Sequence, residues 1–219
     1  MKNCKTVVLS CLGCLLSLTA CEIDAYDKGE GEYSLMTADL ADAHVGSDKR
    51  VDYVDTDQDD RLAVQTPFEL SWVETPDTTC RIIFYYRMQS DGKAEAVSIG
   101  RVGVLQPRDT IAGGLKADPL YLESAWLAKN RKNLNLRLRL LTGATDDEEA
   151  VHRIGLLRDT LSSTPTHFVA RLYHDQGGRP EYYSSIAYAS IPLSQIDADT
   201  LTLHVHTYDG LVSRTFIRN

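Results

Sequence analysis

The sequence has no apolar run long enough to cross a membrane as a helix. Its longest uncharged, mostly apolar run covers twelve residues, Val7 to Leu18, whereas a membrane-spanning helix needs about 20 apolar residues. Two lysines, Lys2 and Lys5, precede the run. A positive flank followed by a short apolar core is the layout of a secretory signal. We therefore expect residues 1–20 to be a signal peptide and the chain to be exported.

The end of this signal points to a lipid anchor. Leu18-Thr19-Ala20-Cys21 places small residues before a cysteine, which resembles the lipobox of bacterial lipoproteins. The resemblance implies cleavage before Cys21 and acylation of that cysteine. Stable anchoring takes at least two acyl chains, and a lipoprotein of this type carries three. The resemblance thus predicts permanent attachment to a membrane through Cys21.

Cysteine is otherwise scarce. The sequence holds five cysteines, of which three leave with the signal and Cys21 is assigned to lipid. Only Cys80 remains, so an intramolecular disulfide is excluded. The exported part must be stabilised by packing, and it is long enough to bury a substantial core.

Positive charge is also in short supply. The net charge is −8, and the segment from Glu22 to Gln65 contains thirteen acids against four bases. Nucleic acid is bound through basic contacts to phosphate, so this class of partner is excluded. Residues 21–32 combine acids with glycine and few apolar side chains, which predicts a flexible acidic tether. Acids directly after a lipidated cysteine also resemble the surface-export signal of Bacteroidetes lipoproteins.

The sequence lacks the motifs of the common enzyme classes. We find no nucleophile elbow, Walker loop, dinucleotide fingerprint or zincin helix. A helical period is missing as well, and alternation of apolar and polar residues dominates. The clearest example runs from Asn133 to Leu140, where leucine alternates with asparagine or arginine. This pattern predicts a strand with one buried and one solvent-facing side.

Two all-β domains account for this alternation. Seven short strands between residues 120 and 218 predict an antiparallel β-sandwich, which we place at 116–219. Five or six strands upstream of Leu105 predict a small barrel, which we place at 33–110. The paired Gly113-Gly114, in a segment without strand pattern, mark the expected boundary.

Two clusters have the residue types of metal sites. Asp55, Asp57 and Asp59 match the first half of an EF-hand loop, but Asp60 and Thr66 stand where the glycine and the bidentate glutamate are required. We interpret this segment as a charged hairpin turn.

The second cluster is His204-Val205-His206, which could present two imidazoles on one strand face. Leu201, Leu203 and Val205 form the opposite, apolar face. We interpret the histidines as part of a solvent-facing strand surface, and we predict no metal and no cofactor.

Four segments stand out: Gly31–Leu35, Leu122–Trp126 with the strand after it, Tyr173–Ser184 and Ile191–Leu193. Together they resemble the NigD-like lipoproteins of Bacteroidetes. The resemblance covers nearly all of the exported chain and implies an N-terminal OB-like barrel followed by a C-terminal β-sandwich. It supplies no catalytic residues, and the family name, taken from a protein encoded beside a bacteriocin, implies an accessory or immunity role.

The most specific of these segments is also the best candidate for a partner-binding site. It concentrates tyrosine and arginine around the turn Gly177-Gly178, and these side chains often dominate binding energy at protein interfaces. The alternative is that the same residues are ordinary strand and turn residues. The candidate binding residues are Tyr173, Arg179, Tyr182 and Tyr183.

The sequence thus predicts a non-enzymatic binding or accessory protein of the cell envelope. Anchored through Cys21, it would sit on the outer membrane, facing the periplasm or the cell surface, and bind a protein or a glycan. The alternative is an envelope hydrolase or glycan-binding protein whose site is assembled from distant residues.

Overall fold

The computed structural model describes residues 35–218. The signal peptide, Cys21 and the tether at 21–32 therefore lie outside the described residues. Within the described part the chain is all-β, as predicted, with one short 3-10 turn at Leu193–Gln195 (η1).

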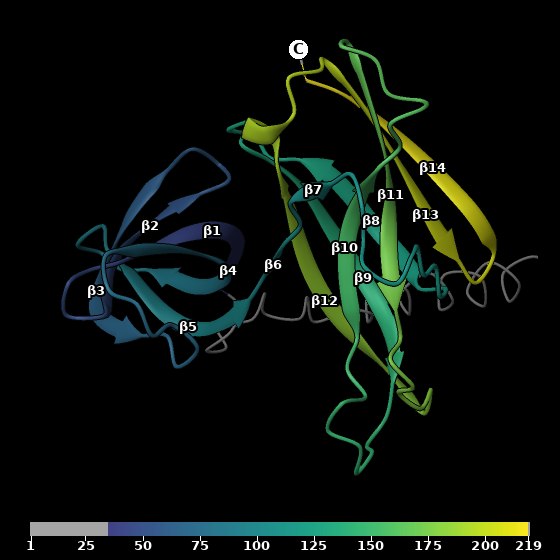
Figure 1. The fold of residues 1–219 in the computed structure, drawn as a ribbon. Coiled ribbons are helices and arrows are strands. Elements are labelled where there is room, and N and C mark those ends of the chain that lie inside the picture. Colours follow the sequence, from purple (N-terminus) through teal and green to yellow (C-terminus); the bar gives the residue numbers. More distant parts are fainter. Residues whose placement is uncertain (1–34, 219) are drawn as a thin grey trace, which may run out of the picture. The chain divides into compact units, whose positions relative to one another are not determined.

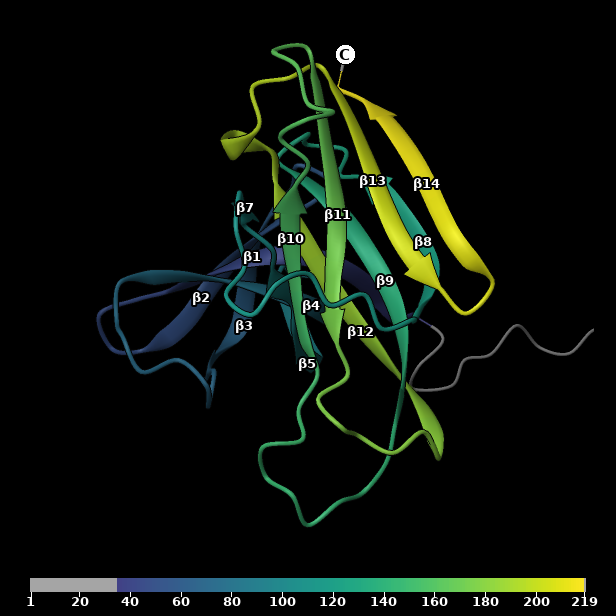
Figure 2. The same ribbon diagram turned by 45° about the vertical axis from the view of Figure 1, so that its right-hand side comes forward.

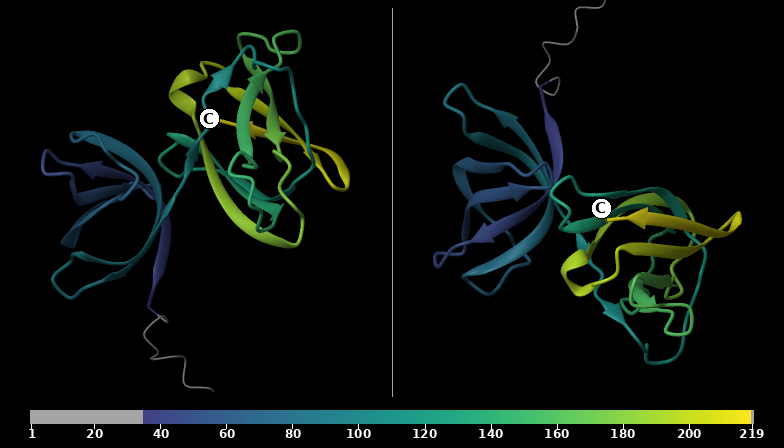
Figure 3. Two further views of the ribbon diagram at one scale, coloured as in Figure 1. Left: turned by 60° about the horizontal axis from the view of Figure 1, so that its bottom comes forward. Right: turned by 90° about the horizontal axis from the view of Figure 1, so that it is seen from above.

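The first five strands form a closed barrel in the order β1-β2-β3-β5-β4 (Figures 1 and 3). β4 pairs antiparallel with β1 along its length, whereas β3 and β5 meet in parallel at the single pair Val64 and Ala94. A five-stranded Greek-key barrel with this strand order is an OB-like barrel, which confirms the predicted fold. Its strands are β1 (Thr37–Val45), β2 (Arg50–Thr56), β3 (Arg61–Glu69), β4 (Thr78–Met88) and β5 (Ala94–Arg101).

The remaining strands form a β-sandwich of two sheets (Figures 1 and 2). One sheet has the order β14-β13-β11-β10-β7 and the other the order β6-β12-β9-β8. The strands are β6 (Gly103–Val104), β7 (Pro107–Arg108), β8 (Tyr121–Leu127), β9 (Asn133–Thr142), β10 (Arg153–Arg158), β11 (His167–Asp175), β12 (Tyr183–Pro192), β13 (Thr200–Thr207) and β14 (Gly210–Ile217).

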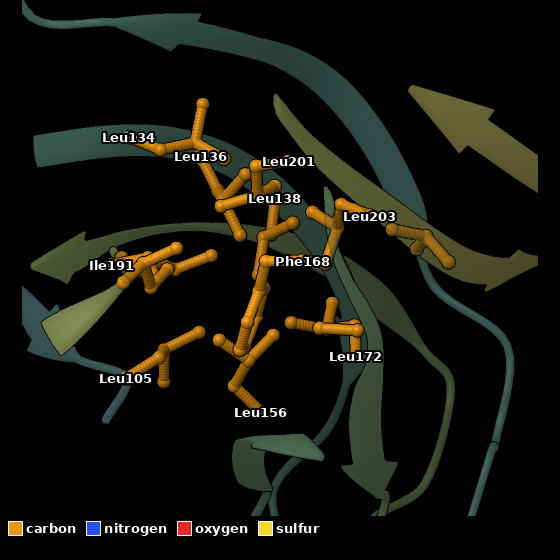
Figure 4. Close-up of a cluster of buried hydrophobic side chains, with 14 of the residues drawn as sticks. Leu105, Leu134, Leu136, Leu138, Leu156, Phe168, Leu172, Ile191, Leu201 and Leu203 are labelled. Carbon is orange, nitrogen blue, oxygen red and sulfur yellow. The ribbon is translucent and has the colours of Figure 1, made fainter. Parts of the chain in front are cut away.

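The sandwich core comes from the predicted alternation. Leu134, Leu136 and Leu138 of β9 are fully buried and belong to one hydrophobic cluster with Leu201 and Leu203 of β13, as Figure 4 shows. Burying a leucine side chain contributes roughly 1.5–3 kcal/mol. Packing of this kind stabilises the sandwich without a disulfide.

The other face of β9 does not match the prediction at its start. Asn133 and Asn135 were expected to face solvent, but both are buried, Asn135 completely. The prediction was wrong because polar residues of the barrel cover this end of the strand. Arg137 and Arg139, further along the same face, are only half-buried.

Barrel and sandwich are joined by a buried polar network. Arg81 of β4 pairs with Asp57, which lies in the turn after β2, and Asn135 donates to the same Asp57 oxygen at 2.6 Å. Arg81 also donates to Ser190 of β12 at 3.1 Å. Each of these four side chains is buried. The predicted hairpin turn is therefore present, and Asp57 within it holds the two domains together.

The strand pairing also bears on the domain boundary. β6 pairs with β12 and β7 pairs with β10, so residues 103–108 belong to the sheets of the sandwich. We had expected them in the first domain because a two-residue strand leaves no alternation in the sequence. That each domain folds by itself stays a prediction.

Candidate binding site

The predicted binding segment, Tyr173 to Tyr183, is firmly held at its turn. Gly177 has a φ of +63°, and a Cβ there would lie 2.3 Å from the Val151 carbonyl oxygen. Only glycine fits such a position. Asp175 forms an ion pair with Lys116 at 2.8 Å and accepts from the Gly177 amide. The backbone of the turn is therefore fixed, and it holds the residues on either side of it in defined positions.

The four candidate residues do not form one cluster. Tyr173 lies on β11 and lines a cavity of about 270 Å³ beside β7 and β10. Arg179 donates to the Gly143 carbonyl oxygen at 2.9 Å, which is a structural role. Tyr182 and Tyr183, by contrast, are 79% and 58% exposed. Tyr183 is the first residue of β12, and Tyr182 comes directly before it.

β12 has an open edge beside these tyrosines. It pairs with β9 from Tyr183 to Pro192, but on its other side it pairs with β6 only at Ala189 and Ser190. Among the described residues, no strand pairs with the outer edge of β12 between Tyr183 and Tyr188. The main-chain groups on that edge are available to a partner.

A cleft of about 760 Å³ adjoins this edge. On one side it is lined by β4 and β5 of the barrel, and on the other by β9, β10 and β12 of the sandwich. Its walls are mostly apolar, with a few polar groups, as is typical of binding sites. Lining residues include Ile99, Arg101, Leu140, His152, Ile154 and Ile186.

One polar atom in the cleft, Nε2 of His152, makes no hydrogen bond of normal geometry among the described residues. His174 Nδ1 lies 3.0 Å from the Asp118 carbonyl oxygen, and His174 Nε2 lies 3.0 Å from His152 Nδ1. Because a carbonyl oxygen only accepts, His174 carries its proton on Nδ1 and accepts from His152 Nδ1 when both rings are neutral. His152 Nε2 is then an acceptor, and it is buried without a hydrogen bond of normal geometry within residues 35–218, although the main chain of Leu141 lies close enough to raise the pKa of the ring.

The environment of His152 favours this neutral form. Burial lowers the pKa of His152, and the adjacent imidazole of His174 lowers it further. A neutral ring keeps Nε2 as an acceptor for a ligand that donates a hydrogen bond.

Arginine supplies the charge of the cleft. Arg137 and Arg139 both form ion pairs with Glu123, at 2.7 and 2.6 Å, so one carboxylate serves two guanidinium groups. Arg101, at the end of β5, has no ion-pair partner among the described residues. Of the two arginines that line the cleft, Arg101 is thus the one without an acidic partner within residues 35–218.

The two clusters considered for metal binding have other partners. Asp55 accepts from Arg61 and lies 2.9 Å from His44, and Asp57 is committed to the buried network. His204 contacts Ser213 at 2.7 Å. No group of three His, Cys, Asp or Glu residues in the described part of the chain is placed to hold a metal ion.

Tyr182 and Tyr183, which the sequence singles out, are exposed, and their role in binding stays a prediction. The open edge and the cleft were not predicted. The edge depends on β6 being only two residues long, and the cleft depends on residues from both domains. One signal was present in the sequence: the segment from Tyr183 to Ser190 contains no charge and no proline.

Comparison with known proteins agrees with this fold. Residues 104–218 match the NigD-like C-terminal beta sandwich domain. No curated protein matches the chain. Within residues 35–218, no helix has the length and apolarity that a membrane span requires.

Several solved structures have a similar fold. A NigD-like immunity protein of Bacteroides caccae is 24% identical, with a TM-score of 0.64 over 84% of this chain and 98% of its own. A proposed toxin-related protein of Parabacteroides distasonis is 16% identical, with a TM-score of 0.59 over 83% of this chain and 92% of its own. A proposed lipoprotein of Bacteroides fragilis is 9% identical, with a TM-score of 0.55 over 83% of this chain and 96% of its own.

None of these three descriptions names an enzyme, and at such identities the likeness shows the fold alone. The match of the family domain extends over more than half of the sequence, from Val104 to Arg218. The chain belongs to the NigD-like family.

Proposed function

We propose that this protein is a lipid-anchored accessory protein of the cell envelope that binds a protein partner without catalysing a reaction. The observation that carries the proposal is the exposed start of β12, where Tyr182 and Tyr183 precede, on the same open edge, the residues Ile186 to Tyr188 that line the cleft. Tyrosine buries a large area on binding at a low cost in conformational entropy, so exposed tyrosines on a rigid strand favour a protein interface.

The similar proteins favour the same class of function. The structures compared above are described as a NigD-like immunity protein, a proposed toxin-related protein and a proposed lipoprotein. Carried over to this chain, these descriptions favour an accessory role, related to immunity or to toxins, on the envelope. The lipobox ending at Cys21 supplies the anchor, and outer-membrane attachment is part of this proposal.

A crosslinking experiment in cells tests the proposal. A photoreactive benzoylphenylalanine is placed at Tyr183, which is 58% exposed on β12, and in a matched variant at Leu211, which is 63% exposed on β14. Position 183 should yield a discrete crosslinked protein species that position 211 does not yield. Equal products from both positions, or none from position 183 in correctly matured protein, would contradict a partner-binding role for this edge.

The alternative functions are a glycan-binding protein and a hydrolase. The same purified protein, incubated with ester, glycoside and peptide substrates, should show no turnover above the buffer control. Turnover that is lost in a His152→Gln variant would favour the hydrolase, because His152 is the titratable imidazole of the cleft.

A further inference from the structure

The main-chain groups of β12 alternate between its two edges. The amide of Leu105, which follows β6, donates to the Ser190 carbonyl oxygen at 2.9 Å, so Ser190 directs its main chain toward the open side. The register with β9 continues without a shift from Tyr183 to Pro192. In a regular strand alternate residues share an orientation. Ser184 and Ile186 therefore present their N–H and C=O groups to the open edge.

This edge lacks the features that normally prevent strand pairing. Proteins protect exposed edges with charges, prolines or bulges. The edge strand β8 contains Glu123 and a bulge between Leu122 and Ser124, and the edge strand β14 contains Arg214. The open part of β12, Tyr183-Ser-Ser-Ile-Ala-Tyr188, has neither charge nor proline, and its pairing with β9 contains no bulge. It is therefore suited to accept another strand.

A strand added to this edge would lie in line with β6, which pairs with β12 only at Ala189 and Ser190. At about 3.3 Å per residue, the six residues from Tyr183 to Tyr188 give an edge about 20 Å long. The cleft of about 760 Å³ adjoins the second half of this edge, Ile186 to Tyr188. One wall contains Leu138, Leu140 and Ile154 of the sandwich, and the other contains Ile99 of β5. A strand in this position would direct alternate side chains to the two apolar walls.

The polar groups of the cleft specify the occupant further. Arg101 is a cation without an ion-pair partner among the described residues, so it favours an acidic side chain. His152 Nε2 makes no hydrogen bond of normal geometry within residues 35–218, so as an acceptor it favours an N–H or O–H donor. A polypeptide segment with apolar residues and one acid satisfies both groups together with the open edge.

We propose that the β12 edge accepts an extended segment of a partner protein as an added β-strand, with alternating apolar side chains in the cleft and an acidic residue at Arg101. This mode of recognition takes affinity from main-chain hydrogen bonds and specificity from pockets for alternate side chains. The inference rests on the proposed function, namely that the protein binds a protein partner.

A displayed library of random peptides of about twelve residues provides the probe. The library is selected against the mature chain, and the enriched peptides are synthesised and titrated. The test variant is Ile186→Pro, which removes an outward N–H while leaving the pairing with β9 intact, because proline is tolerated on edge strands. The matched control is Ile186→Val, which keeps the N–H and a β-branched side chain.

The proposal expects enriched peptides that alternate apolar residues and contain an aspartate or glutamate. Losing one or two main-chain hydrogen bonds should weaken their binding about tenfold in Ile186→Pro, with little change in Ile186→Val. Arg101→Gln should weaken only the acid-containing peptides. Should Ile186→Pro not fold, N-methylation of alternate peptide amides must abolish binding to the unmodified protein.

Three results would overturn the proposal. One is that no peptide is enriched, another is equal binding by Ile186→Pro and the unmodified protein, and the third is indifference to N-methylation. Self-association that Ile186→Pro abolishes would also overturn it, because a second copy would then occupy the edge. A partner that crosslinks at position 183 while the peptides fail would leave the proposed function standing and reject strand addition alone.

Discussion

Replacing Asp57 by alanine should destabilise the whole described part of the protein. Asp57 is 4% exposed and accepts hydrogen bonds from Arg81 and Asn135. Its main-chain bonds to Leu40 and Asn130 survive the change. The substitution therefore removes the carboxylate and leaves the buried guanidinium of Arg81 without its main partner.

The magnitude follows from burial of the pair. Removing one partner of a buried ion pair typically costs about 3–5 kcal/mol. Arg81 keeps a second acid, Asp42, at 3.2 Å, and this acid is partly exposed. We therefore expect a loss near the lower limit, about 3 kcal/mol in free energy of unfolding. For a chain of this size that corresponds to a fall in Tm of about 6–12 °C.

Chemical denaturation followed by circular dichroism measures this loss. The matched control is Asp60→Ala, which removes an exposed acid from the same turn and should change stability by less than about 0.5 kcal/mol. A double variant, Asp57→Leu with Arg81→Met, should be more stable than Asp57→Ala alone, since it removes the buried charge as well.

Equal stability of Asp57→Ala and Asp60→Ala would contradict this prediction. A double variant less stable than Asp57→Ala would contradict it as well, because the loss in stability would then not come from an unpaired Arg81.

Three further predictions concern other parts of the chain. The pKa of His152 is lowered in the folded state, so below about pH 6.5 the unfolded chain binds more protons and the folded state loses stability as the pH decreases. Between about pH 7.5 and 5.5 the Tm should therefore decrease less in His152→Gln than in the unmodified protein, and an equal decrease would exclude this histidine as a cause. A fragment of residues 103–219, which contains β6 and β7, should unfold cooperatively and at a higher urea concentration than a fragment of residues 116–219. Equal midpoints would mean that these two strands contribute nothing to the stability of the sandwich. Cys21→Ser should abolish labelling with radioactive fatty acid and partitioning into detergent, and unchanged labelling would contradict anchoring at this residue.

The sequence was sufficient to predict the fold class because alternation is a local property. The leucines of β9 and the apolar face of β13 indicated their own burial, and both lie in the sandwich core. Asn135 could not be placed in this way, because its burial depends on Asp57, 78 positions earlier in the chain. Contacts between distant segments have no local pattern.

The candidate site illustrates the same limit. Tyr182 and Tyr183 were found from residue type and turn chemistry, and both are exposed. Tyr173 and Arg179 were grouped with them because they are close in sequence, but the structure directs them to separate neighbours. The open edge of β12 could not be predicted, since it depends on where the pairing with β6 ends.

Amide hydrogen exchange along β12 tests the central claim most directly. In the free protein the amides of Ser184 and Ile186 should exchange quickly, because they face the open edge, whereas those of Ser185 and Ala187, which face β9, should be protected. In complex with the partner recovered by crosslinking at position 183, all four amides should be protected. Slow exchange of Ser184 and Ile186 in the free protein, or fast exchange of both in the complex, would contradict an open edge that accepts a strand.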